Sequence, residues 1–196
     1  GESVRKCGNE ELFTSLATGN IAAFKEAGVQ KVVVSSPHCY YTFKNEYPEL
    51  GAQFEVLHYT QYLAQLAREG KLKFTKEVKK RVAYHDPCYL GRHSGVYDDP
   101  RYLLQSIPGV ELVEMANIRE DSICCGGGGG RVWAETKKGE RFSELRIDQA
   151  AAVGADILAT CCPYCILMLD DSLLTQGKDE VMQVMDISEL VHEAMG

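Results

Sequence analysis

Five cysteines in the second half of the chain have the spacing of a metal site. Cys88 stands alone, Cys124 and Cys125 are adjacent, and Cys162 and Cys165 form a Cys-x-x-Cys pair, with gaps of 35 and 36 residues between these groups. Sites made only of thiolates select zinc or iron–sulfur clusters. A zinc ion takes four ligands in a tetrahedron and leaves a fifth thiol unused, whereas a cluster contains several irons and can use five. We therefore expect an iron–sulfur cluster here, with zinc as the alternative.

A run of glycines at residues 126–130 directly follows the cysteine doublet. A phosphate-binding loop would continue with Lys and then Ser or Thr, but this run continues with Arg131 and Val132. Glycine instead allows the backbone to approach a cluster closely and to direct N–H groups at its sulfurs. We therefore assign Gly126 and Gly127 to cofactor binding.

Three residues around Cys88 are candidates for catalysis: His85, Arg92 and His93. An imidazole titrates near neutral pH, so His85 could donate a proton to a thiolate that leaves a cleaved disulfide. The alternative is that His85 is a hydrogen-bonded residue at a strand end. Arg92, Arg131 and His93 could instead bind an anionic substrate.

Two further cysteines are predicted not to be ligands. Cys161 directly precedes Cys162, and neighbouring side chains on a strand point to opposite faces. Cys161 is therefore expected to pack in the core. Cys7 is solitary in the sequence.

The chain contains an internal repeat. Residues 28–43 and 154–169 match at a constant offset, which pairs Pro37 with Pro163 and Cys39 with Cys165. Ser36 takes the place that Cys162 has in the second copy, and the doublet of the first copy would fall directly before residue 1. We therefore expect an incomplete first repeat over residues 1–80 and a complete second repeat over residues 81–196.

Apolar patterning and breaker residues predict alternating helices and strands. The expected helices cover 9–27, 38–47, 60–69, 100–106, 135–153 (the longest), 163–173 and 188–195, the last capped by Ser188. The expected strands lie within 31–36, 54–59, 79–88, 110–115, 154–162 and 180–186. This order predicts an α/β fold of two Rossmann-like units with mainly parallel sheets. The cysteines then fall at the carboxyl ends of strands, where such sheets place their sites.

Composition limits the partners and the compartment. The net charge of −7 argues against nucleic acid as a partner. No apolar run approaches the ~18 residues of a membrane span, and no signal peptide is recognised. Cysteines in doublets without a secretory signal are typical of metal ligands in a reducing compartment, so we expect a cytoplasmic protein.

The segments HDPCYLGR (85–92), CCGGGG (124–129) and TCCPYC (160–165) closely resemble the CCG cysteine-rich domain. That domain occurs in pairs in the B and D subunits of heterodisulfide reductase and in related iron–sulfur subunits. The resemblance implies a pseudo-twofold pair of CCG domains, the first truncated here. It also implies that Cys88, Cys124, Cys125, Cys162 and Cys165 hold a [4Fe-4S] cluster, noncubane in the heterodisulfide reductase relatives, and that Cys39 is a ligand in the first repeat.

The resemblance also implies a function. We expect an iron–sulfur oxidoreductase subunit of heterodisulfide-reductase type that transfers electrons to a disulfide, a thiol or a quinone-linked acceptor. Its partners would be a ferredoxin-like iron–sulfur domain or subunit and a membrane-associated redox partner, which would hold it at the periphery of the inner membrane. The alternatives are an electron-transfer module without its own substrate site, or a zinc-binding structural or interaction domain.

Overall fold

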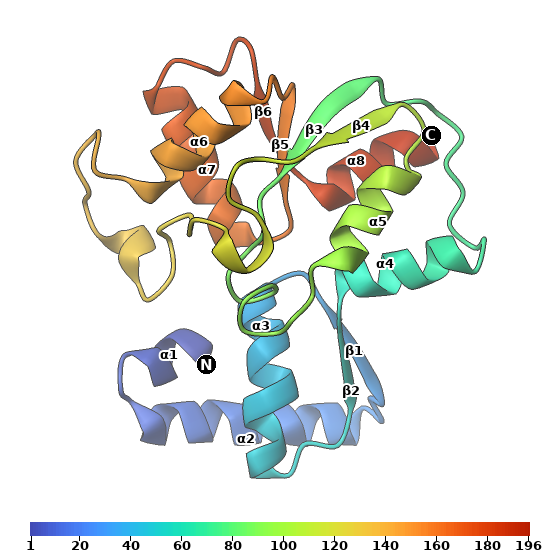
Figure 1. Ribbon diagram of the computed structural model, residues 1–196. Coiled ribbons are helices and arrows are strands. Elements are labelled where there is room, and N and C mark those ends of the chain that lie inside the picture. Colours follow the sequence, from blue (N-terminus) through green and yellow to red (C-terminus); the bar gives the residue numbers. More distant parts are fainter.

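The computed structural model describes all residues, 1–196, and contains two parallel sheets (Figure 1). The larger sheet has the order β4-β3-β5-β6, and the smaller one pairs β1 with β2. The strands are β1 (Lys31–Val34), β2 (Glu55–His58), β3 (Lys80–Tyr84), β4 (Val110–Val113), β5 (Ile157–Thr160) and β6 (Gln183–Asp186). Every strand pair is parallel, which confirms the predicted α/β fold.

Helices cover both faces of the larger sheet (Figure 1). One face carries α6 (Phe142–Ala152) and α7 (Pro163–Thr175), and the other carries α5 (Asp98–Ser106) and α8 (Ile187–Met195). The smaller sheet lies with α1 (Glu2–Lys6), α2 (Glu10–Glu26) and α3 (Pro37–Tyr41) in the lower part of this view. The helix α4 (Tyr59–Arg68) packs on α5 and so joins the two parts.

Side chains along β5 point alternately to the two faces of the larger sheet, and each face has its own hydrophobic core. Ile157 and Ala159 belong to the core under α5 and α8, whereas Leu158 belongs to the core under α6 and α7. The alternation continues past the strand, so that Cys161 faces the first core and Cys162 the second. The prediction that Cys161 packs in the core is confirmed, because its side chain is fully buried and its Sγ lies 3.3 Å from the hydroxyl of Tyr84.

The strand order creates a crevice at one point of the larger sheet. The chain passes from β3 to β4 on one side and then crosses to β5 on the other side of β3. In parallel sheets, sites form outside the carboxyl ends of strands at such a reversal. The segments after β3, β4 and β5 all start from this edge, and each of them carries cysteines.

Two details of the helix prediction are wrong. The helix predicted over 135–153 begins only at Phe142, so that α2, with 17 residues, is the longest helix. The residues before Phe142 include Gly139 at a φ of +88°, a left-handed conformation that interrupts a helix. The cap of α8 is Asp186, whose carboxylate accepts from the backbone N–H of Ser188 at 2.9 Å, and Ser188 lies inside the helix.

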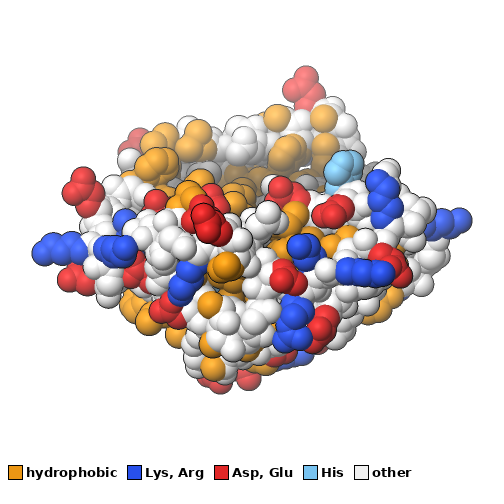
Figure 2. Space-filling model, turned by 90° about the horizontal axis from the view of Figure 1, so that it is seen from above, with side chains coloured by type: hydrophobic (Ala, Val, Ile, Leu, Met, Phe, Trp, Pro, Cys, Tyr) orange, Lys and Arg blue, Asp and Glu red, His pale blue; other side chains and the backbone are white.

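The surface seen from above the larger sheet is of mixed charge. Figure 2 shows basic and acidic side chains interspersed on this face, without a large patch of one sign. Among the helices, none is long and apolar enough to cross a lipid bilayer.

Candidate metal centre

The five cysteines of the predicted site meet in one place. Cys88 follows β3, the doublet lies on the loop after β4, and the Cys-x-x-Cys pair begins α7. Cys124 interacts directly with Cys88 and Cys125, and Cys165 interacts directly with Cys125 and Cys162. None of these cysteines forms a disulfide. The sulfurs therefore form one continuous group.

Burial gives the group a closed side and an open side. Cys125, Cys162 and Cys165 are buried, with exposed fractions of 3%, 2% and 2%. Cys88 and Cys124 are only half-buried. Any molecule that reaches the group from solvent therefore approaches Cys88 and Cys124.

The neighbouring thiols change one another's pKa values. Hydrogen bonds from Cys125 and Cys88 lower the pKa of Cys124, and a hydrogen bond from Cys165 lowers the pKa of Cys162. The interaction with Cys124 raises the pKa values of Cys88 and Cys125, and the interactions with Cys125 and Cys162 raise the pKa of Cys165. Five adjacent thiols cannot all ionise without a cation, because each negative charge disfavours the next. The donor set thus has the chemistry of a multivalent soft-metal site.

Backbone N–H groups surround the sulfurs. The N–H of Gly126 donates to Cys124 Sγ at 3.3 Å, and the N–H of Gly127 interacts with Cys125. At the start of α7, Cys162 is the N-cap without a side-chain capping hydrogen bond, and the Cys165 thiol first, then the nearby backbone N–H groups of Cys165 and Tyr164, lower its pKa. The partial positive charge of a helix N-terminus stabilises a thiolate at this position.

At two positions of the loop, glycine is favoured for different steric reasons. Gly126 has a φ of +83°, which other residues rarely adopt. A Cβ on Gly127 would lie 2.8 Å from Cγ of Met168 and 3.4 Å from the carbonyl oxygen of Tyr164. The loop is therefore pressed against α7, and together with the thiols it fits a thiolate-ligated cluster.

His85 lies behind the closed side of the thiol group. Its side chain is fully buried, and a ring nitrogen lies within 4.8 Å of the sulfurs of Cys125 and Cys165. Nδ1 accepts a hydrogen bond from Nε of Arg146 at 3.1 Å, which leaves Nε2 as the protonated nitrogen. Burial and the charge of Arg146 lower the pKa of His85 to about 3, so the ring is neutral at pH 7.

A buried ion pair next to His85 fixes the segment before the doublet. Both carboxylate oxygens of Asp86 accept from Arg101, at 2.6 and 2.8 Å. One of them also accepts from the backbone N–H of Arg119 at 2.9 Å. Arg119 has a φ of +55°, so this contact holds a left-handed residue in place, five residues before Cys124. The sequence contains no spacing signal for Asp86, Arg101 or Arg146.

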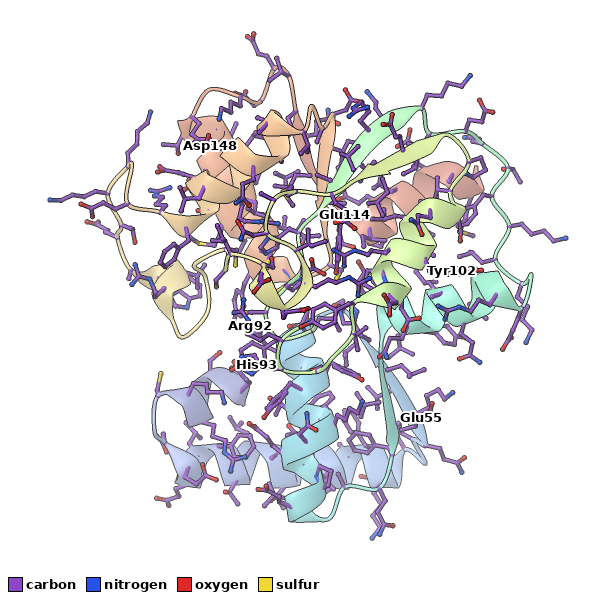
Figure 3. The ribbon with its side chains drawn as sticks, in the orientation of Figure 1. Glu55, Arg92, His93, Tyr102, Glu114 and Asp148 are labelled. Atoms are coloured by element: carbon purple, nitrogen blue, oxygen red, sulfur yellow. The ribbon has the colours of Figure 1, made fainter.

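Arg92 and His93 lie on the loop after β3, which faces the end of α3 (Figure 3). The guanidinium of Arg92 donates to the carbonyl oxygens of Glu120 and Ser122, so it holds this loop to the segment before the doublet. His93 is exposed and stacks on Tyr89, with ring centroids 4.6 Å apart. Neither residue is among the groups that interact with the five sulfurs, and an anion-binding role for them stays a prediction.

A cavity of about 120 Å³ lies between the two parts of the molecule, against the glycine loop that follows the doublet. Lys6 and His38 line it from the first part, and Gly127, Trp133 and Tyr164 from the second. The His38 ring is buried between Tyr164 and a tyrosine next to Cys88, and its Nδ1 has no hydrogen-bond partner. The cavity therefore contains a cationic side chain, the carboxylate of Glu2 at 3.9 Å from the His38 ring nitrogen, and no side chain of the five cysteines.

The structure does not bring the remaining cysteines to this group. Cys39 is exposed near the start of α3, and Cys7 is exposed at the end of α1. Cys7 lines the cavity between the two parts of the molecule, and Cys39 lies outside the segments that follow β3, β4 and β5. The ligand role of Cys39 stays a prediction for the first repeat.

Comparison with known proteins identifies relatives of the whole chain. A family model for a cysteine-rich domain, CCG, matches residues 1–44 and 82–170, together more than half of the chain. The chain is 43% identical over 195 residues to the probable iron-sulfur-binding oxidoreductase FadF of Bacillus subtilis, a match that covers 100% of the chain and 28% of that protein. It is 41% identical over 202 residues to the EtfAB:quinone oxidoreductase of Syntrophomonas wolfei, with the same coverage.

A third relative is part of an archaeal reductase. The chain is 42% identical over 193 residues to the D subunit of the dihydromethanophenazine:CoB–CoM heterodisulfide reductase of Methanosarcina mazei. This match covers 95% of the chain and 46% of that relative. The chain thus spans less than half the length of each of these three relatives.

Proposed function

Because this chain belongs to the CCG family of cysteine-rich domains, we propose that it is the cluster-binding part of an iron–sulfur oxidoreductase of heterodisulfide-reductase type. The observation that carries the proposal is the continuous group formed by Cys88, Cys124, Cys125, Cys162 and Cys165. A structural zinc ion would leave one of these five thiols unused. A [4Fe-4S] cluster, of the noncubane type that the family resemblance implies, has a use for each.

When bound, the cluster supplies one-electron chemistry. The chain's own residues hold and tune it. The five thiolates bind the irons, and the N–H groups of Gly126, Gly127 and the start of α7 stabilise negative charge on the sulfurs. The burial of Cys125, Cys162 and Cys165 excludes water from one side. Cys88 and Cys124, which are half-buried, would hold the cluster on the side that a redox partner can approach.

The cavity between the two parts of the molecule, which is lined by Gly127 of the loop after the doublet, is the proposed place for the electron acceptor. Lys6 there attracts an anionic group, and His38 provides an unpaired ring nitrogen. A disulfide or thiol compound and a quinone-linked partner are the two acceptor classes, because one relative is named as a heterodisulfide reductase and another as a quinone oxidoreductase. Electrons would arrive from a ferredoxin-like iron–sulfur domain or subunit, and a membrane-associated partner would complete the complex.

Metal analysis tests the proposal. We expect the protein, purified without oxygen, to contain about four irons and a matching amount of acid-labile sulfide per chain, with a paramagnetic signal in one oxidation state. A signal that changes on addition of a disulfide supports a reductase with its own substrate site. Iron without such a response supports an electron-transfer module. One zinc per chain and no sulfide would contradict the proposal and indicate a structural zinc domain.

A further inference from the structure

Arg146 is a buried arginine without a carboxylate partner. It lies on α6, and its side chain has an exposed fraction of 0%. Its guanidinium donates to Nδ1 of His85 at 3.1 Å, to the carbonyl oxygen of Asn117 at 2.8 Å and to the side-chain oxygen of Gln149. All three acceptors are neutral, and Nη2 has no partner. No carboxylate lies within 4 Å of the guanidinium. An isolated buried charge is strongly unfavourable, so this one requires a nearby anion.

Arg101, another buried arginine of this chain, is paired with carboxylates. Its guanidinium is paired with Asp86 at 2.6 Å and with Glu114 at 2.7 Å. Asp86 also stabilises the charge of Arg146 from a greater distance, but both of its oxygens are already bonded to Arg101. Arg146 therefore needs an anion other than this carboxylate.

The thiol group, once its sulfurs are ionised as metal ligands, supplies the second anion near Arg146. After Asp86, Cys165 is the next group that stabilises the guanidinium, and it does so in its ionised form, which is the form that ligates a metal. Arg146 also acts through His85, whose ring lies within 4.8 Å of the sulfurs of Cys125 and Cys165. Because Nδ1 accepts from Arg146, the proton of the ring is on Nε2, which has no other partner.

We propose that Arg146 is the buried counter-charge of the thiolate-bound cluster, and that together with His85, which it positions, it raises the cluster's reduction potential. This inference rests on the proposed function and deepens it. Reduction adds an electron to a centre that is already negative, and a fixed positive charge in a dry interior stabilises the added charge more strongly than it would in water. The unpaired N–H of His85, on a ring within reach of the sulfurs of Cys125 and Cys165, would act in the same direction.

Redox titration of the cluster-loaded protein tests this role. Arg146→Met removes the charge and the donors. We expect the midpoint potential of the cluster in this variant to fall by at least about 59 mV, which corresponds to a tenfold change in the equilibrium constant of one-electron reduction. We also expect iron to be lost to a chelator at least about tenfold faster, as when other residues that hydrogen-bond to metal ligands are removed. Arg146→Lys retains the charge and should stay closer to the parent in both measurements. Arg146→Gln, which keeps donors without the charge, replaces Arg146→Met if the latter does not fold.

The outcomes separate this inference from the proposed function. If the parent binds iron but the charge-removing variants titrate at the parent's potential, Arg146 is only structural and the inference is wrong. The same holds if Arg146→Lys is shifted as far as the charge-removing variants. If the parent binds no iron, the proposed function fails, and the tuning role fails with it.

Discussion

Replacing Cys165 with serine is expected to remove the iron from the protein. Cys165 interacts with both Cys125 and Cys162 and is 2% exposed, so no other side chain or water can take its place among the sulfurs. A serine hydroxyl is not ionised at neutral pH and is a hard ligand, unlike a thiolate. Loss of a residue that hydrogen-bonds to a metal ligand lowers metal affinity by about 10- to 100-fold. Loss of the ligand itself should have a larger effect, so we expect little iron or acid-labile sulfide per chain. Metal and sulfide analysis of anaerobically purified protein measures this.

Two serine variants provide matched controls for this prediction. Cys161→Ser changes a residue directly before the Cys-x-x-Cys pair, but its side chain faces the other core and Tyr84. Cys7→Ser changes an exposed cysteine far from the thiol group in the sequence. Both variants should retain the parent's iron content. Equal iron in Cys165→Ser and in the parent would show that Cys165 is not a ligand.

Gly127→Val is expected to displace the loop that covers the thiols. The Cβ alone would lie 2.8 Å from Cγ of Met168, which is in the middle of its side chain, and 3.4 Å from a backbone oxygen of α7. Overpacking of this kind costs about 1–3 kcal/mol, and here the strain acts on the N–H groups that face Cys124 and Cys125. We expect a lower thermal midpoint and a several-fold faster loss of iron to a chelator, both followed optically.

Gly128→Val is the control for this variant. A Cβ at this position has no atom within 4 Å, and the backbone of Gly128 is not left-handed. Its stability and iron release should match those of the parent. Similar losses in both variants would indicate that valine acts through the loop's flexibility, and the close approach to α7 would then not be what Gly127 provides.

The convergence of the cysteines could be predicted from the sequence because it depends on topology. Parallel strands have their carboxyl ends at one edge, and Cys88, the doublet and Cys162 each follow a strand. The opposite orientations of Cys161 and Cys162 follow from alternation along β5. These features depend on local patterns that are visible in the residues themselves.

The surroundings of the site could not be predicted in the same way. Arg146 reaches His85 from a position 61 residues further along the chain, and Arg101 reaches Asp86 over 15 residues. No periodicity or motif encodes such pairs, because they depend on how α5 and α6 pack on the sheet. The start of α6 also differs from the prediction. Residues 135–141 contain helix-compatible side chains, but they form a loop around Gly139.

The predicted internal repeat has structural parallels. Both β2 and β6 lead directly into a helix through a capping box, with His58 as the cap of α4 and Asp186 as the cap of α8. Both α3 and α7 begin with a proline, at Pro37 and Pro163, two residues before a cysteine. These likenesses support the repeat, and the boundary between residues 80 and 81 stays a prediction.

Anomalous diffraction at the iron absorption edge, from crystals of the protein grown without oxygen, tests the central claim most directly. We expect iron peaks at a single place, with the sulfurs of Cys88, Cys124, Cys125, Cys162 and Cys165 around them. A peak at the zinc edge alone, or iron at a distance from these five sulfurs, would contradict the claim.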